Sequence, residues 1–283
     1  MKNDKFDIVD DILINALKED VGNGDITTTS LVPENLVAQA SLIAREKFVL
    51  AGMPFARRVF QLLDENVTFK VFKKDGSHVW SDQVLVKIKG NARSLLTAER
   101  TALNLLQRMS GIASLTESYT DKIKSTGVKI VDTRKTAPGL RFFDKYAVRT
   151  GGGHNHRSGL FDGILVKDNH IAVAGGVRKA VRLARLRSQH MLKVEVEVKN
   201  ISQVKDALTA GADIIMLDNM SVDKMKKAVE IIHVKNRDII IEASGNITLD
   251  NVSDIAKTGV NLISVGALTH SAPASDISMD VDF

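Results

Sequence analysis

The second half of the chain repeats one pattern, in which a short apolar run is followed by an amphipathic stretch. Within the 283 residues, the apolar runs lie at 128–131, 163–166, 194–198, 214–217, 239–241 and 262–265. The amphipathic stretches between them include 173–186, 201–208, 222–232 and 249–256. Six β/α repeats of this kind predict a parallel sheet with helical crossovers, arranged either as a barrel or as a doubly wound sheet.

Two features favour the barrel. No Gly-rich dinucleotide-binding fingerprint follows the first apolar run, which argues against an ordinary Rossmann domain. The predicted strands also end in charged or small residues, and barrel enzymes build their active sites from side chains at that end of the strands. These strand ends are 132–135, 167–169, 195–197, 218–219, 242–245 and 264–266.

The chain before residue 91 has a different texture, which is typical of an α+β unit. Val9, Ile12 and Leu17 recur at the spacing of one helix face. Strand-like runs follow at 39–45, 67–72 and 84–89. Between the last two runs, the Asp75-Gly76 pair predicts a tight turn.

A long amphipathic helix is predicted over 94–109, and Gly111 is expected to cap its C-terminus. Arg100 lies four residues after Leu96 and three before Leu103, so we expect it along the packed side of this helix. A charged side chain there needs an anionic partner. The partners available within the same chain are Glu99 and Glu117.

These textures define the expected domains. Residues 1–111 are expected to form an N-terminal α+β domain that includes the bridging helix. Residues 112–270 are expected to form the α/β barrel, and the tail, 271–283, is expected to return to the N-terminal domain.

Composition excludes several classes of protein. Cys is absent, which removes disulfide scaffolds, thiol catalysis and Cys-ligated metal sites. The net charge is +5, but acids and bases are interleaved and aromatic residues make up only 5%, so nucleic acid is not an expected partner. Residues 1–11 are acidic and lack the pattern of a signal peptide, and no apolar run approaches the roughly 18–20 residues of a membrane span. We therefore expect a cytoplasmic protein with no membrane partner.

Two carboxylates stand out among the strand ends. The period of two along the third apolar run sends Glu195 and Glu197 to one face, toward the barrel interior. Asp218 ends the next strand and is expected beside Glu197. Two acids there could ligate Mg²⁺, hold a sugar diol or stabilise a cationic transition state. The alternative for both glutamates is a buried ion pair with Lys167 or Lys193.

Cations are predicted to converge on the same end of the barrel. They are Arg134 and Lys135 after the first strand, His156 and Arg157 after a run of three glycines, and Lys167 at the end of the second strand. Arg binds carboxylates and phosphates bidentately, whereas Lys acts as a point charge. Any one of them alone is easily explained as a surface cation, but five at one end predict a substrate with several negative charges.

Small residues also precede predicted helix N-termini, where backbone N–H groups bind phosphate. They are Ser244, Gly245, Asn246, Gly266 and Ala267. A further group combines histidines with one acid and has metal-binding side chains. It comprises His154, His156, His170 and Asp168. We favour a Mg²⁺ ion brought in by a phosphate substrate over a metal that this group holds.

In their order along the chain, these motifs resemble those of the quinolinate phosphoribosyltransferase family. The resemblance runs over nearly the whole chain. The motifs that carry it are Glu19-Asp20, Gly24-Asp25-Ile26-Thr27, Ala98-Glu99-Arg100-Thr101-Ala102-Leu103-Asn104, Ser110-Gly111, Asp132-Thr133-Arg134-Lys135-Thr136, Gly152-Gly153-His154-Asn155-His156-Arg157, Lys167-Asp168-Asn169-His170, Glu195-Val196-Glu197, Leu217-Asp218-Asn219, Ser244-Gly245-Asn246 and Gly266-Ala267-Leu268-Thr269-His270-Ser271.

The resemblance implies an N-terminal α/β sandwich and an incomplete, open α/β barrel, in a homodimer or larger homo-oligomer. It implies an enzyme that transfers phosphoribosyl from phosphoribosyl pyrophosphate to quinolinate with Mg²⁺ and then releases CO₂. The products are nicotinate mononucleotide and pyrophosphate, a step of NAD biosynthesis. The alternative is a paralogue acting on another acid or base, such as the molybdenum-transport-associated relatives. Arg134, His156 and Arg157 favour a substrate with two carboxylates.

The resemblance also implies roles for individual residues. The quinolinate carboxylates and the pyrophosphate are assigned to Arg134, His156, Arg157 and Lys167, with Thr133 and Lys135 beside them. Glu197 and Asp218 are expected to hold the ribose hydroxyls and stabilise positive charge at the anomeric carbon, and with Lys167 they form the catalytic set. Phosphate binding is assigned to Ser244, Gly245, Asn246, Gly266 and Ala267. Arg100 is expected to reach the neighbouring subunit's site, and no metal is expected to be held by the protein alone.

Overall fold

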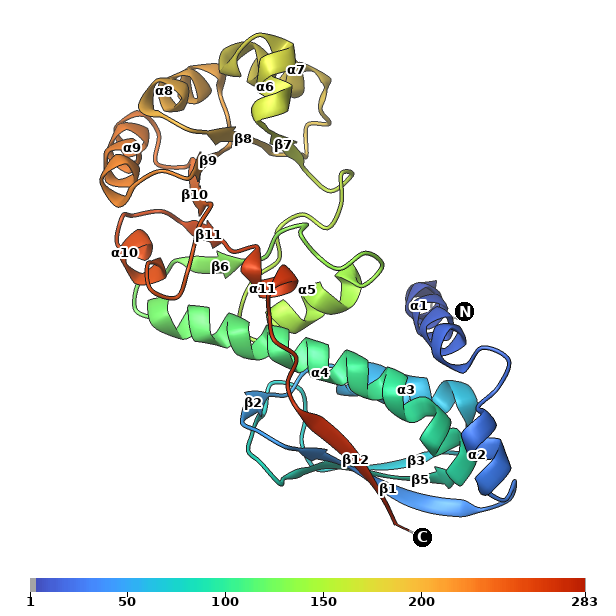
Figure 1. Ribbon diagram of the computed structural model, residues 1–283. Coiled ribbons are helices and arrows are strands. Elements are labelled where there is room, and N and C mark those ends of the chain that lie inside the picture. Colours follow the sequence, from blue (N-terminus) through green and yellow to red (C-terminus); the bar gives the residue numbers. More distant parts are fainter. Residues whose placement is uncertain (1–3, 283) are drawn as a thin grey trace. The chain divides into compact units, whose positions relative to one another are not determined.

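The computed structural model of the protein describes the chain from residue 4 to residue 282, and its side chains from residue 8. The chain forms two compact units, whose elements are labelled in Figure 1. Unit 1 contains the chain up to Leu115, Ala137–Gly151 and the chain from Ser271. Unit 2, the barrel unit, contains Thr116–Thr136 and Gly152–His270.

Unit 1 is built on a four-stranded antiparallel sheet. Its strands, in spatial order, are β12 (Ile277–Asp282), β1 (Val37–Ala44), β5 (Val84–Asn91) and β3 (Thr68–Val71). A second ribbon pairs β2 (Phe48–Val49) with β4 (His78–Val79), and a turn at Asp75-Gly76 precedes β4 as the sequence predicts. The C-terminal segment therefore completes the sheet of unit 1 as an edge strand.

Helices cover this sheet. Of these, α3 (Met53–Leu63) and α4 (Ala92–Ile123) lie along the sheet in Figure 1, and α2 (Ile26–Leu31) lies at its end. Helix α1 (Asp4–Val21) packs against α3. The helix expected around Val9 and Leu17 is α1, and both side chains are buried. The helix expected at 94–109 is α4, which is 32 residues long.

The expectation that Gly111 ends this helix is wrong, because α4 continues through it to Ile123. A Cβ atom at Gly111 would lie 1.9 Å from the carbonyl oxygen of Pro273. The glycine is therefore explained by a close approach of the C-terminal segment to the helix, and not by a left-handed cap.

Helix α5 (Arg141–Thr150) belongs to unit 1, although the expected barrel domain, 112–270, includes it. The Phe55 ring makes edge-on contacts with three rings of α5, at centroid distances of 5.0–5.8 Å. Asp144 is fully buried and accepts two hydrogen bonds of 2.8 Å from Arg108 on α4. Aromatic packing and a bidentate ion pair thus hold this segment against unit 1.

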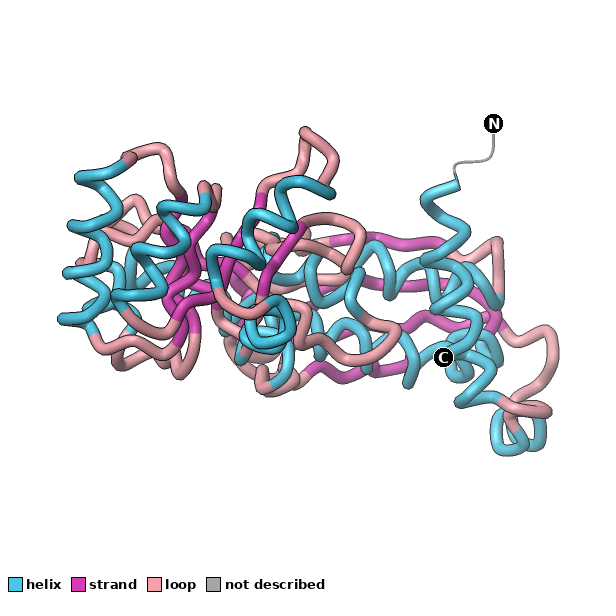
Figure 2. The backbone as a smooth tube through the Cα atoms, turned by 90° about the horizontal axis from the view of Figure 1, so that it is seen from above, coloured by secondary structure: helices cyan, strands magenta, loops and turns pink. Residues whose placement is uncertain are grey.

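Unit 2 contains a six-stranded parallel sheet in the order β6-β11-β10-β9-β8-β7. The strands are β6 (Lys129–Val131), β7 (Ile164–Val166), β8 (Val194–Val198), β9 (Ile214–Asp218), β10 (Ile240–Ser244) and β11 (Leu262–Ser264). No hydrogen-bonded ladder joins the two outer strands, β6 and β7, among the described residues, so the barrel is open as expected. Helices lie on the outer side of the curved sheet in Figures 1 and 2. They are α6 (Asp168–Ala174), α7 (Val177–Arg187), α8 (Ile201–Ala210), α9 (Val222–Lys235) and α10 (Val252–Ala256), and the short helix α11 (Ala267–His270) follows β11.

The sequence predicts one amphipathic stretch at 173–186, and this prediction is wrong because the stretch is interrupted. Gly175 and Gly176 both have positive φ angles, 83° and 125°, and they separate α6 from α7. Residues with a Cβ atom disfavour this backbone, so the two glycines allow the chain to change direction. Across residues 4–282, no helix is both long and apolar enough to cross a membrane.

The register of the parallel strands stacks inward-facing residues in rows. Asp218 on β9 lies opposite Ser244 on β10 and Ser264 follows on β11. In the next row into the barrel, Met216 on β9 lies opposite Glu197 on β8 and opposite Glu242 on β10. Acidic and small polar side chains therefore line the interior toward the carboxyl ends of the strands.

Candidate active site

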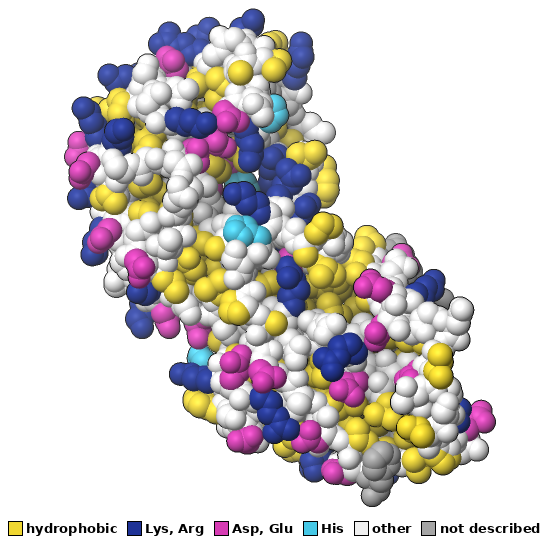
Figure 3. Space-filling view, in the orientation of Figure 1, with side chains coloured by type: hydrophobic (Ala, Val, Ile, Leu, Met, Phe, Trp, Pro, Cys, Tyr) yellow, Lys and Arg dark blue, Asp and Glu magenta, His cyan; other side chains and the backbone are white. Residues whose placement is uncertain are grey.

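A cavity of about 340 Å³ opens at the carboxyl ends of the strands of unit 2. Figure 3 shows basic, acidic and His side chains gathered around a hollow on this unit. The residues that line the cavity are Thr133, Arg134, Lys135, His156, Arg157, Leu165, Lys167, Glu197, Met216, Asp218, Asn219, Glu242, Ser244, Gly245, Asn246 and Ser264. Each strand of the open barrel contributes at least one lining residue, either within the strand or shortly after its end.

One wall of the cavity is cationic. Burial and the positive charge of Arg134 lower the pKa of the Arg157 guanidinium, while Glu195 opposes the shift. Two guanidinium groups held this close repel each other unless an anion lies between them. Lys135 and Lys167 add exposed positive charges to the same cavity. This wall is suited to carboxylate and phosphate groups.

A buried acid joins the two segments that carry these cations. Asp132 follows β6 and is fully buried. Its carboxylate accepts hydrogen bonds from the Asn155 side chain at 2.6 Å and from the His156 N–H at 2.8 Å. His154 also pairs with Val131 as a parallel bridge, so the loop runs beside β6. The chain before Arg157 is thereby fixed next to the chain before Arg134.

The opposite wall is acidic. Burial raises the pKa of the Glu197 carboxyl, and the negative charge of Asp218 raises it further, whereas Lys167 lowers it. The sequence prediction that these two acids lie together is confirmed by this coupling and by their shared cavity. The charges of Lys167 and Lys199 offset part of the repulsion between the two acids. The carboxylates make this wall attractive to a cation or to hydroxyl groups.

Asn219 orients the acidic wall. Its side-chain amide donates to Asp218 at 2.9 Å, and its side-chain oxygen accepts from Asn246 at 2.9 Å. A Cβ at Gly245, where φ is +91°, would lie 2.3 Å from this oxygen. Asn219 and Asn246 themselves have φ angles of 53° and 50°. Only glycine fits between the two asparagines, so the 244–246 turn and Asp218 form one connected network.

The structure brings most of the predicted site residues into this cavity. Those that line it are Thr133, Arg134, Lys135, His156, Arg157, Lys167, Glu197, Asp218, Ser244, Gly245 and Asn246. Gly266 and Ala267 are not among the lining residues. Gly266 lies against the Lys135 side chain, because a Cβ there would be 3.2 Å from its Cδ atom. The Thr269 hydroxyl donates to the Lys135 carbonyl oxygen at 2.7 Å.

Arg100 belongs to unit 1, and its predicted position on the packed side of the helix is wrong. Its side chain is 58% exposed, and its nearest acidic partner is Glu99, at 3.9 Å. The buried face of α4 contains Ala98, Ala102 and Leu106. That face follows the 3.6-residue period from Ala98, which places Arg100 on the other side of the helix.

Three polar residues line the cavity that were not predicted as site residues from the sequence, namely Asn219, Glu242 and Ser264. Glu242 had a usable signal, because the period of two along β10 places it on the same face as Ser244. Asn219 had a signal in its left-handed backbone, which Asn tolerates better than most residues. Ser264 gave no signal beyond its place near a strand end.

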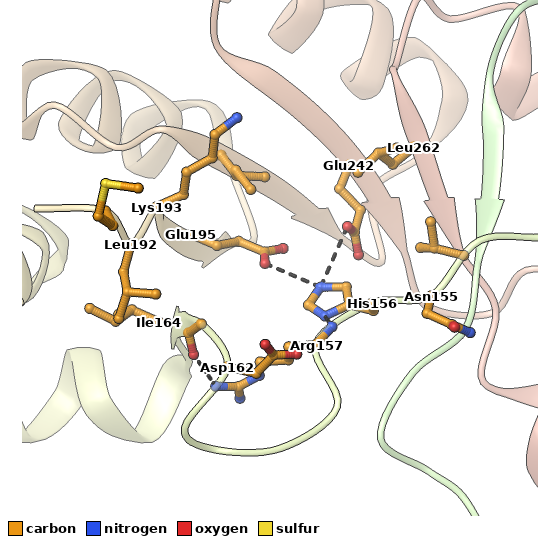
Figure 4. A pocket seen from close by; sticks show the side chains of 14 residues that line it. Asn155, His156, Arg157, Asp162, Ile164, Leu192, Lys193, Glu195, Glu242 and Leu262 are labelled. Atoms are coloured by element: carbon orange, nitrogen blue, oxygen red, sulfur yellow. Dashed lines mark hydrogen bonds and ion pairs between the residues drawn. The ribbon is translucent and has the colours of Figure 1, made fainter. Parts of the chain in front are cut away.

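The prediction that Glu195 faces inward is confirmed, and the alternative, an ion pair of Glu195 with Lys167 or Lys193, is not what the structure shows. Glu195 faces inward, and its Oε2 atom lies 3.2 Å from His156 Nε2. It lines a second cavity of about 490 Å³, drawn in Figure 4, whose lining includes the first residues of β7, β9 and β11, namely Ile164, Ile214 and Leu262. Burial deep in the barrel separates it from the two exposed lysines.

The metal-binding group suggested by the sequence does not come together as such. Asp168 pairs with Lys199 at 3.0 Å, and His170 Nδ1 accepts the Lys167 N–H at 2.9 Å. Within the described part of the chain, the group whose ligand atoms converge within 4.8 Å is His156, Glu195 and Glu242.

Comparison with known proteins agrees with this geometry. Residues 25–110 match the N-terminal domain of quinolinate phosphoribosyl transferase, and residues 112–280 match its C-terminal domain. A probable nicotinate-nucleotide pyrophosphorylase [carboxylating] of Bacillus subtilis is 45% identical over 93% of this chain and 90% of its own length. One from Synechocystis is 46% identical over 97% of this chain and 92% of its own length.

Solved structures are similar over the same extent. The crystal structure of NadC from Streptococcus pyogenes has a TM-score of 0.91, is 45% identical, and covers 97% of this chain and 96% of its own. The nicotinate-nucleotide pyrophosphorylase of Francisella tularensis has a TM-score of 0.90, is 44% identical, and covers 98% and 96%. The chain therefore belongs to the quinolinate phosphoribosyl transferase family, as its motifs indicate.

Proposed function

We propose that this chain is a carboxylating nicotinate-nucleotide pyrophosphorylase. It transfers the phosphoribosyl group of phosphoribosyl pyrophosphate to quinolinate and releases pyrophosphate and CO₂, leaving nicotinate mononucleotide for NAD biosynthesis. The observation that carries the proposal is one cavity with a cationic wall and an acidic wall. Relatives named for this activity, at 45% and 46% identity, support it.

The cationic wall binds the acid substrate. Quinolinate carries two carboxylates, and phosphoribosyl pyrophosphate carries several more charges. Arg134 and Arg157 present fork-shaped donors to the carboxylates, and their mutual repulsion is relieved when the dianion binds. Lys167 and Lys135 contribute point charges to this wall. Lys167 also acts on the acidic wall, because its positive charge lowers the pKa of the Glu197 carboxyl.

The acidic wall acts on the sugar. Cleavage of the bond to pyrophosphate leaves positive charge on the anomeric carbon and ring oxygen of the ribose. Glu197 and Asp218 stabilise that charge and accept hydrogen bonds from the ribose hydroxyls. Because Asn219 donates to Asp218 at 2.9 Å, this carboxylate is already oriented before the substrate arrives.

The pyridine nitrogen of quinolinate then bonds to the anomeric carbon, and pyrophosphate leaves with the electrons of the broken C–O bond. The ring nitrogen becomes positively charged. When the carbon–carbon bond to the adjacent carboxylate breaks, CO₂ leaves and its bonding electrons remain on the ring carbon beside that positive nitrogen. A proton finally adds to this carbon. The substrate supplies its own electron sink, so the chain's residues only position it.

Mg²⁺ fits the donor groups of this cavity as a partner of the pyrophosphate. It neutralises phosphate charge and prefers oxygen ligands, and the cavity offers the carboxylates of Glu197 and Asp218. The proposal assigns the ion to the pyrophosphate and not to a closed set of protein ligands. The phosphate itself is assigned to the turn at Ser244, Gly245 and Asn246, with Gly266 and Ala267 behind Lys135.

The exposed side chain of Arg100 is available for a second copy of the chain. We assign it to the active site of the neighbouring subunit in a homodimer or larger homo-oligomer. We propose the cytoplasm as the setting of this protein.

The test uses quinolinate labelled with ¹⁴C in the 2-carboxylate. Purified protein is mixed with it, phosphoribosyl pyrophosphate and Mg²⁺, and both CO₂ and nicotinate mononucleotide are measured. We expect the two products in equal amounts, and none without phosphoribosyl pyrophosphate. Parallel reactions with nicotinate and other pyridine or pyrimidine acids test the paralogue alternative. Turnover of one of these in place of quinolinate contradicts the proposal.

A further inference from the structure

A buried cluster lies directly behind the cationic wall, and the mechanism above does not use it. Glu195 is 4% exposed and Glu242 is 1% exposed. Their Oε2 atoms lie 3.2 Å and 3.7 Å from Nε2 of His156, as the dashed lines in Figure 4 show. The first distance allows a hydrogen bond and the second is too long for one.

The cluster is connected to the substrate-binding cation next to it in sequence. Nδ1 of His156 accepts the backbone N–H of Arg157 at 2.8 Å. The Arg157 guanidinium donates to the Gly163 carbonyl oxygen at 2.8 Å, and the negative charge of Glu195 acts on it directly. The His156 ring therefore links a buried acid to the backbone of Arg157, while the same acid balances the charge of the Arg157 side chain.

The two cavities of unit 2 show which groups can meet substrate. His156, Arg157 and Glu242 line both cavities and form a partition between them. Glu195 lines only the second cavity, so it lies behind the partition. An acid that faced a dicarboxylate would repel it. Because Glu195 lies behind the cations, its negative charge attracts their side chains and holds them in place.

We propose that Glu195, supported by Glu242, is a positioning residue for the quinolinate site. It fixes the His156 ring and the charge and orientation of Arg157 without touching the substrate. This inference rests on the proposed function, and nothing in the family comparison assigns either glutamate a role.

The charge balance of the cluster is consistent with this role. Burial and the negative charge of Glu195 together raise the pKa of the Glu242 carboxyl to about 7, although His156 and Ser264 act in the opposite direction. Two carboxylates this close in the interior share a proton in preference to both being charged. Glu242 therefore takes up a proton more readily than an ordinary glutamate, which reduces the repulsion inside the cluster.

A bound metal ion is the competing interpretation of three converging ligand atoms. It conflicts with the hydrogen bonding of the ring. Because Nδ1 of His156 accepts an N–H, the ring proton lies on Nε2, and a protonated nitrogen cannot ligate a metal.

The test compares Glu195→Gln with wild type. Glutamine keeps the size of the side chain but removes its charge. We expect the KM for quinolinate to rise about tenfold, while the KM for phosphoribosyl pyrophosphate changes by less than about twofold. Glu242→Gln resembles the protonated acid and is expected to change the quinolinate KM by less than Glu195→Gln does. Equal changes in both KM values, or none in a folded protein, overturn the proposal.

Val194→Ala is the matched control, because Val194 is fully buried and precedes Glu195 on β8. We expect this variant to lower the melting temperature and leave both KM values unchanged. If it raises the quinolinate KM as Glu195→Gln does, the effect comes from the loosened strand, and the positioning role is refuted.

A readout without turnover separates this proposal from the proposed function. Long-range ¹H–¹⁵N spectra of protein labelled at its 7 histidines report which ring nitrogen carries the proton, with His156→Gln used for assignment. We expect His156 to be protonated on Nε2, and its resonances to move in Glu195→Gln but not in Val194→Ala. Unmoved resonances, a proton on Nδ1, or a stoichiometric divalent metal that Glu195→Gln releases overturns the proposal, even if wild type does not turn over quinolinate.

Discussion

Replacing Glu197 by Gln separates the function of the acidic wall from its effect on folding. The substitution preserves the shape of the side chain and removes the charge that faces the sugar. An oriented group of this kind contributes about 2.7–4 kcal/mol to the transition state, so kcat is expected to fall about 10²–10³-fold. The KM for quinolinate should change little, because the acid substrate binds the opposite wall.

The same substitution is expected to stabilise the fold. Burial and the charge of Asp218 raise the pKa of the Glu197 carboxyl above its value in the unfolded chain. A group with a raised pKa contributes stability at low pH that is lost as pH rises through the folded pKa. At pH 7.5 the ionised Glu197 is therefore a cost, and Gln removes it. The melting temperature of Glu197→Gln should equal or exceed that of wild type at pH 7.5, with the difference vanishing toward pH 4.

The assay combines steady-state CO₂ release with thermal denaturation at several pH values. Glu230→Gln, at an exposed position on α9, is the control and should change neither. The kcat of wild type should fall as pH drops through the pKa of Glu197, and this acid limb should be absent from the residual activity of the variant. A variant with near-normal kcat, or one that loses activity and melting temperature together, refutes the reasoning.

Three further outcomes follow from other contacts. Arg157→Ala should weaken quinolinate binding, measured by calorimetry, by about 2–5 kcal/mol, because a substrate carboxylate loses its buried partner. Nicotinate should not restore turnover in this variant. A quinolinate affinity equal to that of wild type contradicts the prediction. Arg100→Ala and Lys167→Ala should each be nearly inactive. After subunit exchange, a mixture of the two variants should regain about a quarter of wild-type activity, because half of the randomly paired dimers contain one intact site. Activity that stays at background, with subunit exchange verified, places Arg100 in the active site of its own chain. Gly111→Ala should lower the melting temperature, because its Cβ would lie 1.9 Å from the Pro273 carbonyl oxygen, and an unchanged value shows that the two segments do not touch.

Much of the barrel unit follows from local sequence. The period of two places Glu195 and Glu197 inside, and Asp218 is expected beside Glu197 because it ends the next strand. The strand ends also carry the cations and the Ser244 turn. These predictions succeed because alternation along a strand depends on neighbours only two residues away. The common register of a parallel sheet then brings every strand end to the same side.

Other features depend on contacts between segments far apart in the chain. Gly111 looks like a helix cap by local rules, and its reason is the C-terminal segment at Pro273. Helix α5 follows the first barrel strand in sequence, and ring contacts with Phe55 place it in unit 1. Arg100 was assigned to a packed face because it lies near Leu96 and Leu103, and although Leu103 is buried, the Arg100 side chain itself is 58% exposed.

The sequence by itself determined the alternating architecture, the family and the set of charged residues at the strand ends. The tertiary structure decided which of those charges meet. Glu195, for which a lysine partner was one alternative, is the partner of His156, and Glu242 joins them from the strand that leads to the Ser244 turn. Periodicity reports the direction of a side chain from its own strand. The partner it meets inside a barrel depends on the stagger and curvature of the other strands, which local sequence does not encode.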